Sequence, residues 1–269
     1  MGRIILYTFL VFGLSTFLIV HHLSNRVYSR DLIEAIEESD YEKLSILLDK
    51  KGNIDAKPYS TFQSFFLEIF NDPPLFYAVR EGDAESVRLL LEHGADANMI
   101  SDDYSPLMEA SNSLKIERFE IAHLLLDYGA DINFVDKWGN TPVLLFNFNH
   151  NSKDNYDDAY TLFLRFVSLG VIPDSSQGFT YGNFLLYAVT TNNVLIVDYL
   201  IHSMSYDIHS IGKDGASALI RATQYHAVLV VEYLIENGVD ISYRDGFNKS
   251  AYDYAVEYNY TEIISILQD

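Results

Sequence analysis

The 269-residue sequence contains no cysteine and only one tryptophan. Without cysteine the chain can form no disulfide, no thiolate metal site and no cysteine nucleophile. Basic residues are also few, because 18 Lys and Arg stand against 38 Asp and Glu, a formal net charge of −20 at pH 7. Nucleic-acid binding depends on clustered Lys and Arg that displace counterions from phosphates. This charge balance therefore argues against a nucleic-acid partner and favours a basic protein partner.

The sequence motifs of common catalytic and phosphate-binding sites are missing as well. The patterns G-x-G-x-x-G, G-x-x-x-x-G-K-[ST], H-E-x-x-H and G-x-S-x-G do not occur. We therefore expect no enzymatic activity, no cofactor and no bound metal. One alternative is an enzyme whose site is assembled from His202, Asp207 and His209. Against it, these residues flank an irregular turn and lack a short metal-ligand spacing.

Residues 4–20 form an almost continuous apolar stretch, preceded by Arg3 and followed by Arg26 and Arg30. A helix of this length reaches about 25 Å, the short end of what crosses a bilayer. We interpret residues 1–29 as a signal peptide or signal anchor, with a transmembrane helix at about 4–20 and a passable cleavage site at 27–29. The body is then expected outside the cytoplasm of a bacterium, anchored in the inner membrane or periplasmic. Cleavage and orientation stay open.

From residue 31 onward one pattern recurs about every 33 residues, a period typical of stacked helix pairs. Most copies have an apolar residue with a small residue three positions later, and the clearest ones continue with Leu-Leu and Gly-Ala-Asp. The clearest copy runs from Pro74 to Asn98, and Thr141-Pro142 follows the turn 136–140. Over residues 30–269 these motifs resemble the ankyrin repeat family. The resemblance implies an all-α solenoid of about seven helix pairs, with repeats at about 30–57, 72–104, 105–140, 141–179, 180–215, 216–248 and 249–269.

Glycines and their replacements predict where the helices stop. Gly94, Gly129 and Gly238 follow second helices, where a left-handed residue ends a helix. Between the helices of a pair, Gly82 is replaced in later copies by Asn192, His226 and Asn259. These residue types tolerate a positive φ better than most, so we expect the turn to persist.

An insertion at residues 58–71, rich in Phe and Tyr, separates the first two copies. Two interpretations remain open. The aromatic residues could pack beneath the N-terminal repeat, or they could contact a second partner or lipid.

In the ankyrin family, variable contacts lie around the turn before each first helix and just after its small residue. Trp138, the single tryptophan, falls at such a turn, and tryptophan is enriched in binding hot spots. Carried onto this chain, the resemblance implies a partner-binding surface made of Arg80, Glu81, Asp102, Tyr104, Asn112, Lys137, Trp138, Asn140, Phe148, Lys213, Asp214, Gln224, Tyr225, Phe247, Glu257 and Tyr258.

The resulting expectation is a monomeric, non-enzymatic scaffold that binds one protein partner on a preformed concave face. Its contact with the membrane would run through the N-terminal segment. A sharper hypothesis is a periplasmic immunity or inhibitor protein that neutralises a toxic secreted effector, because exported bacterial ankyrin-repeat proteins include such inhibitors. The alternatives are a helper of another periplasmic protein, or a membrane-associated structural protein whose aromatic insertion contacts lipid.

Overall fold

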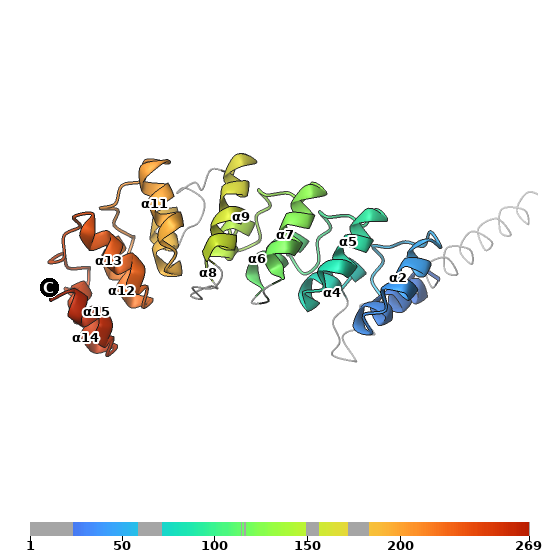
Figure 1. Ribbon diagram of the computed structural model, residues 1–269, viewed down its shortest axis with the longest axis horizontal. Coiled ribbons are helices and arrows are strands. Elements are labelled where there is room, and N and C mark those ends of the chain that lie inside the picture. Colours follow the sequence, from blue (N-terminus) through green and yellow to red (C-terminus); the bar gives the residue numbers. More distant parts are fainter. Residues whose placement is uncertain are drawn as a thin grey trace, which may run out of the picture. The chain divides into compact units, whose positions relative to one another are not determined.

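A computed structural model describes residues 24–58, 72–113, 115, 117–148, 156–171 and 183–268 (Figure 1). Every regular element in these ranges is a helix, apart from two isolated bridges, Ser101 with Tyr104 and Ile211 with Ser217. The expected all-α class is thereby confirmed. Within the same ranges no helix is both long and apolar enough to span a bilayer. The apolar stretch 4–20 and residues 59–71 of the aromatic insertion lie outside the described residues.

The chain divides into two compact units. Unit 1 holds the described residues up to Ala110, together with Leu124–Ala130. Its elements are a helix over residues 24–37, α2 (Tyr41–Leu48), α4 (Pro74–Glu81), α5 (Ala84–Glu92), most of α6 (Pro106–Asn112) and the end of α7 (Arg118–Asp127).

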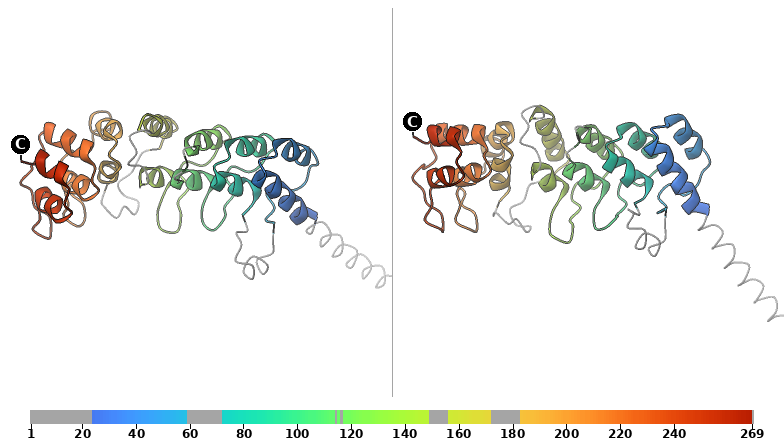
Figure 2. Two further views of the ribbon diagram at one scale, coloured as in Figure 1. Left: turned by 60° about the horizontal axis from the view of Figure 1, so that its bottom comes forward. Right: turned by 90° about the horizontal axis from the view of Figure 1, so that it is seen from below.

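Unit 2 holds Ser111–His123 and the described residues from Asp131 onward. After the start of α7 it contains α8 (Pro142–Phe148), α9 (Tyr156–Ser168), α10 (Phe184–Ala188) with the 3-10 helix η2 (Val189–Thr191), α11 (Val194–His202), α12 (Ala218–Gln224), α13 (Val228–Glu236), α14 (Ala251–Glu257) and α15 (Thr261–Ile266). The described residues thus form seven helix pairs, counting the pair 24–37 with α2. Within each unit the first and second helices make two layers, and the connecting turns project to one side (Figure 2).

The first helix begins earlier than the sequence indicated. Residues 24–29, assigned above to the N-terminal segment, are helical and packed. Ser29 is completely buried and its hydroxyl donates a hydrogen bond to the carbonyl oxygen of Ala56, at 2.6 Å. The Asn25 side chain accepts a bond from the backbone N–H of Asn53. The sequence analysis had set the boundary by the basic residues Arg26 and Arg30 that follow the apolar stretch.

The predicted helix ends are confirmed. Gly94, Gly129 and Gly238 have φ values of 89°, 79° and 79°. Asn192, His226 and Asn259, which replace the Gly82 type between paired helices, have φ values of 56°, 56° and 58°. Side chains cap several helix starts, because Asp40, Asp83, Asn193, Ser217 and Ser250 each accept a bond from a backbone N–H of the first turn.

The small residue of the pattern lies where two helices cross, and it is buried in six of the seven pairs as Ala35, Ala78, Ala110, Ala188, Ala222 and Ala255. The fourth pair is the exception, with Phe146 at this position. In unit 2 its ring packs edge-on against Phe119, with 5.6 Å between centroids, and 6.4 Å from Phe166. Aromatic packing thus replaces the close helix contact in this pair.

Unit 2 buries two arginines in different surroundings. The Arg221 guanidinium pairs with the carboxylate of Asp214 at 2.6 Å. Arg118 donates one bond to the carbonyl oxygen of Ser113 and lies over the Phe119 ring, at 4.3 Å from its centroid. Its Nε and Nη2 atoms have no hydrogen-bond partner. Burial without a paired carboxylate among the described residues lowers the pKa of Arg118, so this charge is a cost to the fold.

Gly215 and Gly238 provide a matched test of backbone geometry, since their φ values are 81° and 79°. A Cβ at Gly238 would meet no atom within 4 Å, whereas at Gly215 it would lie 2.8 Å from the backbone nitrogen of Gly246. Gly238→Ala should lower the free energy of unfolding by about 1 kcal/mol, the cost of a left-handed alanine. Gly215→Ala should lower the free energy of unfolding by clearly more than Gly238→Ala does, because its Cβ also meets the Gly246 backbone. Urea denaturation of both variants measures the difference, and equal losses would contradict the close approach of the two turns.

A second pair of variants tests the buried arginines. Arg118→Met should raise the free energy of unfolding by about 1 kcal/mol, because an apolar side chain replaces a desolvated, unpaired charge. Arg221→Met should lower it by about 1 kcal/mol, because Asp214 then loses its partner. Both are read from urea denaturation at pH 7. Destabilisation of similar size in the two variants would show that the charge of Arg118 is compensated.

Candidate functional site

The turn at residues 136–140 presents the single tryptophan. One carboxylate oxygen of Asp136 accepts the backbone N–H groups of Trp138 and Asn140, both at 2.8 Å, and the other accepts the Asn140 side-chain amide at 2.8 Å. Gly139 supplies the positive φ that closes the turn. Trp138 is therefore held at the tip, where 61% of it is exposed. The Lys137 ammonium lies 4.3 Å from the centroid of its ring.

The turn at residues 245–249 repeats this construction. One oxygen of the Asp245 carboxylate accepts the backbone N–H of Phe247 and Lys249, at 2.9 and 3.0 Å. The other accepts the Tyr254 hydroxyl at 2.6 Å. Burial alone would raise the pKa of Asp245, but these three hydrogen bonds outweigh it and the pKa is lowered. Burial and the Asp245 carboxylate raise the pKa of Tyr254 to about 12. Phe247 stands at the tip, 74% exposed.

The turn at residues 212–216 lies directly beside the turn 245–249. The Tyr243 hydroxyl donates to the carbonyl oxygen of Gly215 at 3.0 Å, and the backbones meet at Gly215 and Gly246. The backbone of Asp214 therefore lies close to that of Gly246, the residue before Phe247. The Asp214 carboxylate forms an ion pair with the buried Arg221 and so stabilises the fold.

The ends of the first helices α12 and α14 complete this surface. Tyr225 and Tyr258 cap these helices and are 39% and 44% exposed. The Tyr258 ring lies 5.9 Å from that of Tyr254 and 5.6 Å from that of Tyr260, centroid to centroid. The Gln224 side chain accepts a bond from Arg221 at 3.1 Å. We call Tyr225, Phe247 and Tyr258 the C-terminal aromatic strip.

In unit 1, the predicted contact Arg80 is engaged within the fold. Its guanidinium bonds to the carboxylates of Asp72 and Glu109. The remaining oxygen of Asp72 accepts the Ser101 hydroxyl at 2.9 Å. Because two carboxylates already bind the Arg80 guanidinium, this side chain forms ion pairs within the fold of unit 1.

The other predicted residues are placed as follows. Asp102 forms the exposed tip of a two-residue turn with Asp103, and both have positive φ. Tyr104 ends that turn, Glu81 ends α4 and Asn112 ends α6. Glu257 ends α14 and pairs with Lys249. Phe148 is the last residue of α8, but its side chain lies outside the described part.

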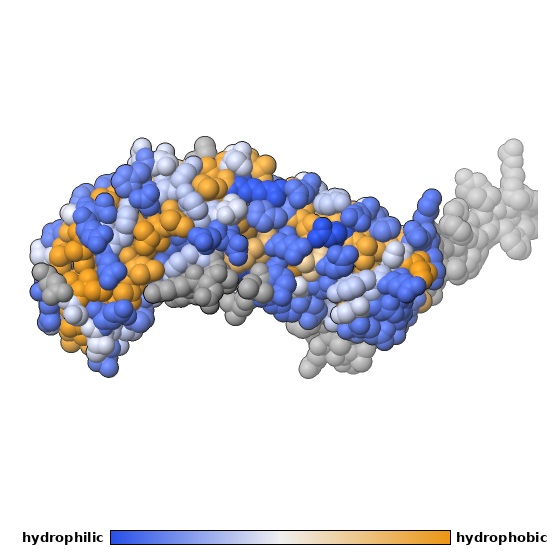
Figure 3. All heavy atoms as spheres, in the orientation of Figure 1, coloured by the Kyte–Doolittle hydropathy of each residue, from blue (hydrophilic) through white to orange (hydrophobic). Residues whose placement is uncertain are grey.

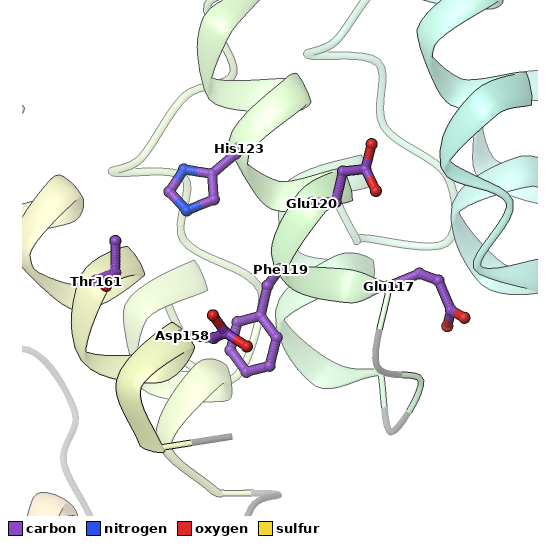
Figure 4. A pocket seen from close by; sticks show the side chains of 6 residues that line it. All are labelled: Glu117, Phe119, Glu120, His123, Asp158 and Thr161. Carbon is purple, nitrogen blue, oxygen red and sulfur yellow. The ribbon is translucent and has the colours of Figure 1, made fainter. Parts of the chain in front are cut away.

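A cavity of about 380 Å³ opens between α7 and α9, lined by Glu117, Phe119, Glu120, His123, Asp158 and Thr161 (Figure 4). Sequence analysis missed it, because the residues come from two second helices far apart in the chain. The carboxylates of Glu117 and Glu120 point away from Asp158 in Figure 4, and the His123 ring is hydrogen-bonded to Arg165 at 2.8 Å.

Residues of the alternative enzyme site interact with neighbours in their own segments of the chain. The Asp207 carboxylate accepts the backbone N–H of His209, and the His202 ring lies 3.1 Å from the carboxylate of Asp198. Across the described ranges, no group of three or more His, Asp or Glu is arranged to hold a metal ion. The absence of enzymatic activity remains an expectation.

The Asp245 turn predicts a pH dependence. Since the pKa of Asp245 is lowered by folding, its carboxylate stabilises the protein fully above its ordinary pKa near ~4. That contribution is lost as the pH falls through the lowered value. Asp245→Asn should therefore cost about 2 kcal/mol at pH 7, and this deficit should shrink below pH ~4. Urea denaturation at pH 7, 5 and 3 measures it, and Tyr254→Phe should reduce the same effect. A deficit that stays constant with pH would contradict the assignment.

Comparison with known proteins supports the fold. A family model described as ankyrin repeats (3 copies) matches residues 32–136 and 185–269. The crystal structure of EF0377, an ankyrin repeat protein, aligns with a TM-score of 0.52 and 26% identity, over 72% of this chain and 96% of that chain. The human ASB11 ankyrin repeat domain aligns with a TM-score of 0.56 and 20% identity, over 73% and 82%, which supports the fold alone.

Curated proteins match in parts. A putative ankyrin repeat-containing protein of Treponema pallidum is 36% identical over 110 residues, 39% of this chain and 36% of that protein. The 2-5A-dependent ribonuclease of Mus musculus is 40% identical over 77 residues, 28% of this chain and 10% of that protein. The chain thus spans well under half the length of these relatives. Together, the paired helices, their turns and the family match over most of the sequence show that the chain belongs to the ankyrin repeat family.

Proposed function

We propose that this protein is a non-catalytic scaffold that binds a protein partner through its turns and the ends of its first helices. One observation carries the proposal. Trp138 and Phe247 stand exposed on turn tips that buried Asp carboxylates hold in place. Large aromatic side chains supply much of the binding free energy of protein interfaces, and turns fixed before binding lose little entropy on association.

The polar residues of the predicted surface support a contact based on aromatic side chains. Asn140, Asp214 and Arg80 each satisfy their hydrogen bonds inside the protein. A partner that used the same atoms would compete with these internal bonds. The exposed rings of Trp138 and Phe247 can be covered while the Asp136 and Asp245 carboxylates keep their bonds to the turns, which favours these rings as anchors.

Two narrower hypotheses concern the partner. In the first, the partner is a toxic secreted effector and the protein is an exported immunity or inhibitor protein. This hypothesis predicts that deleting the gene sensitises the source organism to neighbouring attacker cells. In the second, the protein is a helper of other exported proteins or a membrane-associated structural protein. Liposome flotation of the chain with and without residues 1–23 tests membrane association through the N-terminal segment.

The scaffold proposal is tested by capture from soluble and membrane extracts of the source organism. The full chain is the bait, compared with Trp138→Ala, Phe247→Ala and a control, Tyr128→Ala. Tyr128 is also an exposed aromatic residue but follows a second helix, α7. We expect a captured protein whose yield falls at least tenfold with one of the first two variants and is unchanged with the control. Unchanged capture in all three variants, each with a wild-type melting temperature, would overturn the proposal.

A further inference from the structure

The last helix pair of unit 2, α14 with α15, has one face that no later pair covers within the described residues. Earlier pairs of this unit lie against the pair that follows, since α12 packs against α14 and α13 packs against α15. The same positions of each pair therefore recur in the contact with the next one. In α14 and α15, at the C-terminal end in Figure 1, these positions are open to solvent.

Two positions of the first helix show the difference. Three residues before the position where the paired helices cross, the last pair carries Tyr252, which is 36% exposed. One residue after the crossing, Val189 and Thr223 of the two preceding pairs are completely buried, whereas Val256 of the last pair is 50% exposed. The residues that correspond to Tyr252 in the six earlier pairs are all apolar and at most 3% exposed: Leu32, Leu75, Leu107, Val143, Leu185 and Leu219.

The second helix shows the same change. Val231 and Leu234 of α13 are completely buried. Ile264 and Leu267 occupy the corresponding positions of α15, and both are partly exposed. All four open positions of the last pair thus carry apolar or aromatic side chains. A terminal repeat that is exposed to water needs a polar outer face, and this one does not have it.

The four side chains lie on adjoining parts of one helix pair. Tyr252 and Val256 are one helical turn apart and so neighbour each other on α14. The Gln268 side chain donates a hydrogen bond to the Tyr252 hydroxyl at 3.0 Å, which places the end of α15 beside this part of α14. Figure 3 shows hydrophobic residues gathered over the helices at this end of the chain. We call the following residues the C-terminal end face, which shares no residue with the C-terminal aromatic strip: Tyr252, Val256, Ile264 and Leu267.

The acidic side chains of α14 that border this face are paired. Asp253 bonds to Arg244 at 2.7 Å, and Glu257 bonds to Lys249 at 2.6 Å. The chain as a whole carries a net charge of −20, so two copies repel each other wherever unpaired carboxylates meet. The two ion pairs reduce that repulsion beside Tyr252 and Val256. Another copy of the same chain can therefore approach this face.

We propose that two copies of this protein associate through their C-terminal end faces, in a homodimer with two-fold symmetry. The face has the two-layered build that receives a helix pair of the same kind, as α12 and α13 receive α14 and α15. A second copy supplies such a pair. Two-fold contact sets the apolar residues of one copy against the same residues of the other, and their burial is favourable.

This dimer replaces the monomer expected from the sequence, and it does not depend on the scaffold proposal. The contact uses the outer sides of α14 and α15, whereas the scaffold proposal concerns turn tips that carry Trp138 and Phe247. Either proposal can therefore fail while the other holds.

Sedimentation velocity of the full chain, kept in a mild detergent because of its apolar stretch 4–20, tests the association. We expect monomer and dimer in a concentration-dependent equilibrium between about 1 and about 100 µM. Val256→Asp should raise the dissociation constant at least tenfold, because each copy then buries a carboxylate in an apolar contact. The matched control is Ile46→Asp, on α2 in unit 1, where Ile46 is 55% exposed. It should leave the equilibrium unchanged.

Site-specific cross-linking locates the contact without a disruptive substitution. Because the chain has no cysteine, Val256→Cys introduces a single thiol on the end face, and Ile46→Cys introduces one elsewhere. A short bismaleimide linker should join two copies of Val256→Cys into a species of twice the mass on a denaturing gel. The Ile46→Cys variant should stay monomeric under the same conditions.

The remaining outcomes overturn the dimer. A chain that stays monomeric over the whole concentration range would do so. Association that Val256→Asp leaves intact, or cross-linking that is equally efficient at both thiols, would show that contact between copies lies elsewhere. If both Asp variants weaken association while their melting temperatures stay at the wild-type value, the end face is not the specific contact.

Discussion

The candidate surface depends on hydrogen bonds from the backbone of two turns to the carboxylate at the first residue of each turn. Asp136 and Asp245 each accept two backbone N–H groups within their own turn, and so fix the direction of the residue at the tip. Neither carboxylate bonds to the side chain at the tip. The identity of the tip residue is therefore separate from the stability of the turn, which lets one turn geometry present different side chains. Trp138 and Phe247 occupy corresponding places in two such turns.

Local features of the fold were predictable from the sequence because local geometry requires them. A left-handed residue commonly ends a helix, and the glycines, asparagines and His226 at those positions indicated it. The small residue at the helix crossing was equally visible, because six of the seven pairs carry a buried alanine there. The family itself followed from the order and spacing of these motifs.

Pairings between distant residues could not be predicted in the same way. The sequence alone does not show that Asp214 is held by Arg221, or that Arg80 is held by Asp72 and Glu109. For this reason the predicted surface includes polar side chains that the structure shows to be paired within the fold. The unpaired burial of Arg118 and the cavity between α7 and α9 also depend on which helices pack together, a property with no local signature.

The early start of the first helix restricts how the chain can be processed. A peptidase that cut after Ser29 would remove six helical residues that are already folded, along with the bond from Ser29 to Ala56. Gly52 would also lose the Tyr28 ring that lies against it. A mature protein with an intact first repeat therefore requires any cut to fall upstream of residue 24. Cleavage further along would produce a protein whose N-terminal repeat is exposed and prone to unfold from that end.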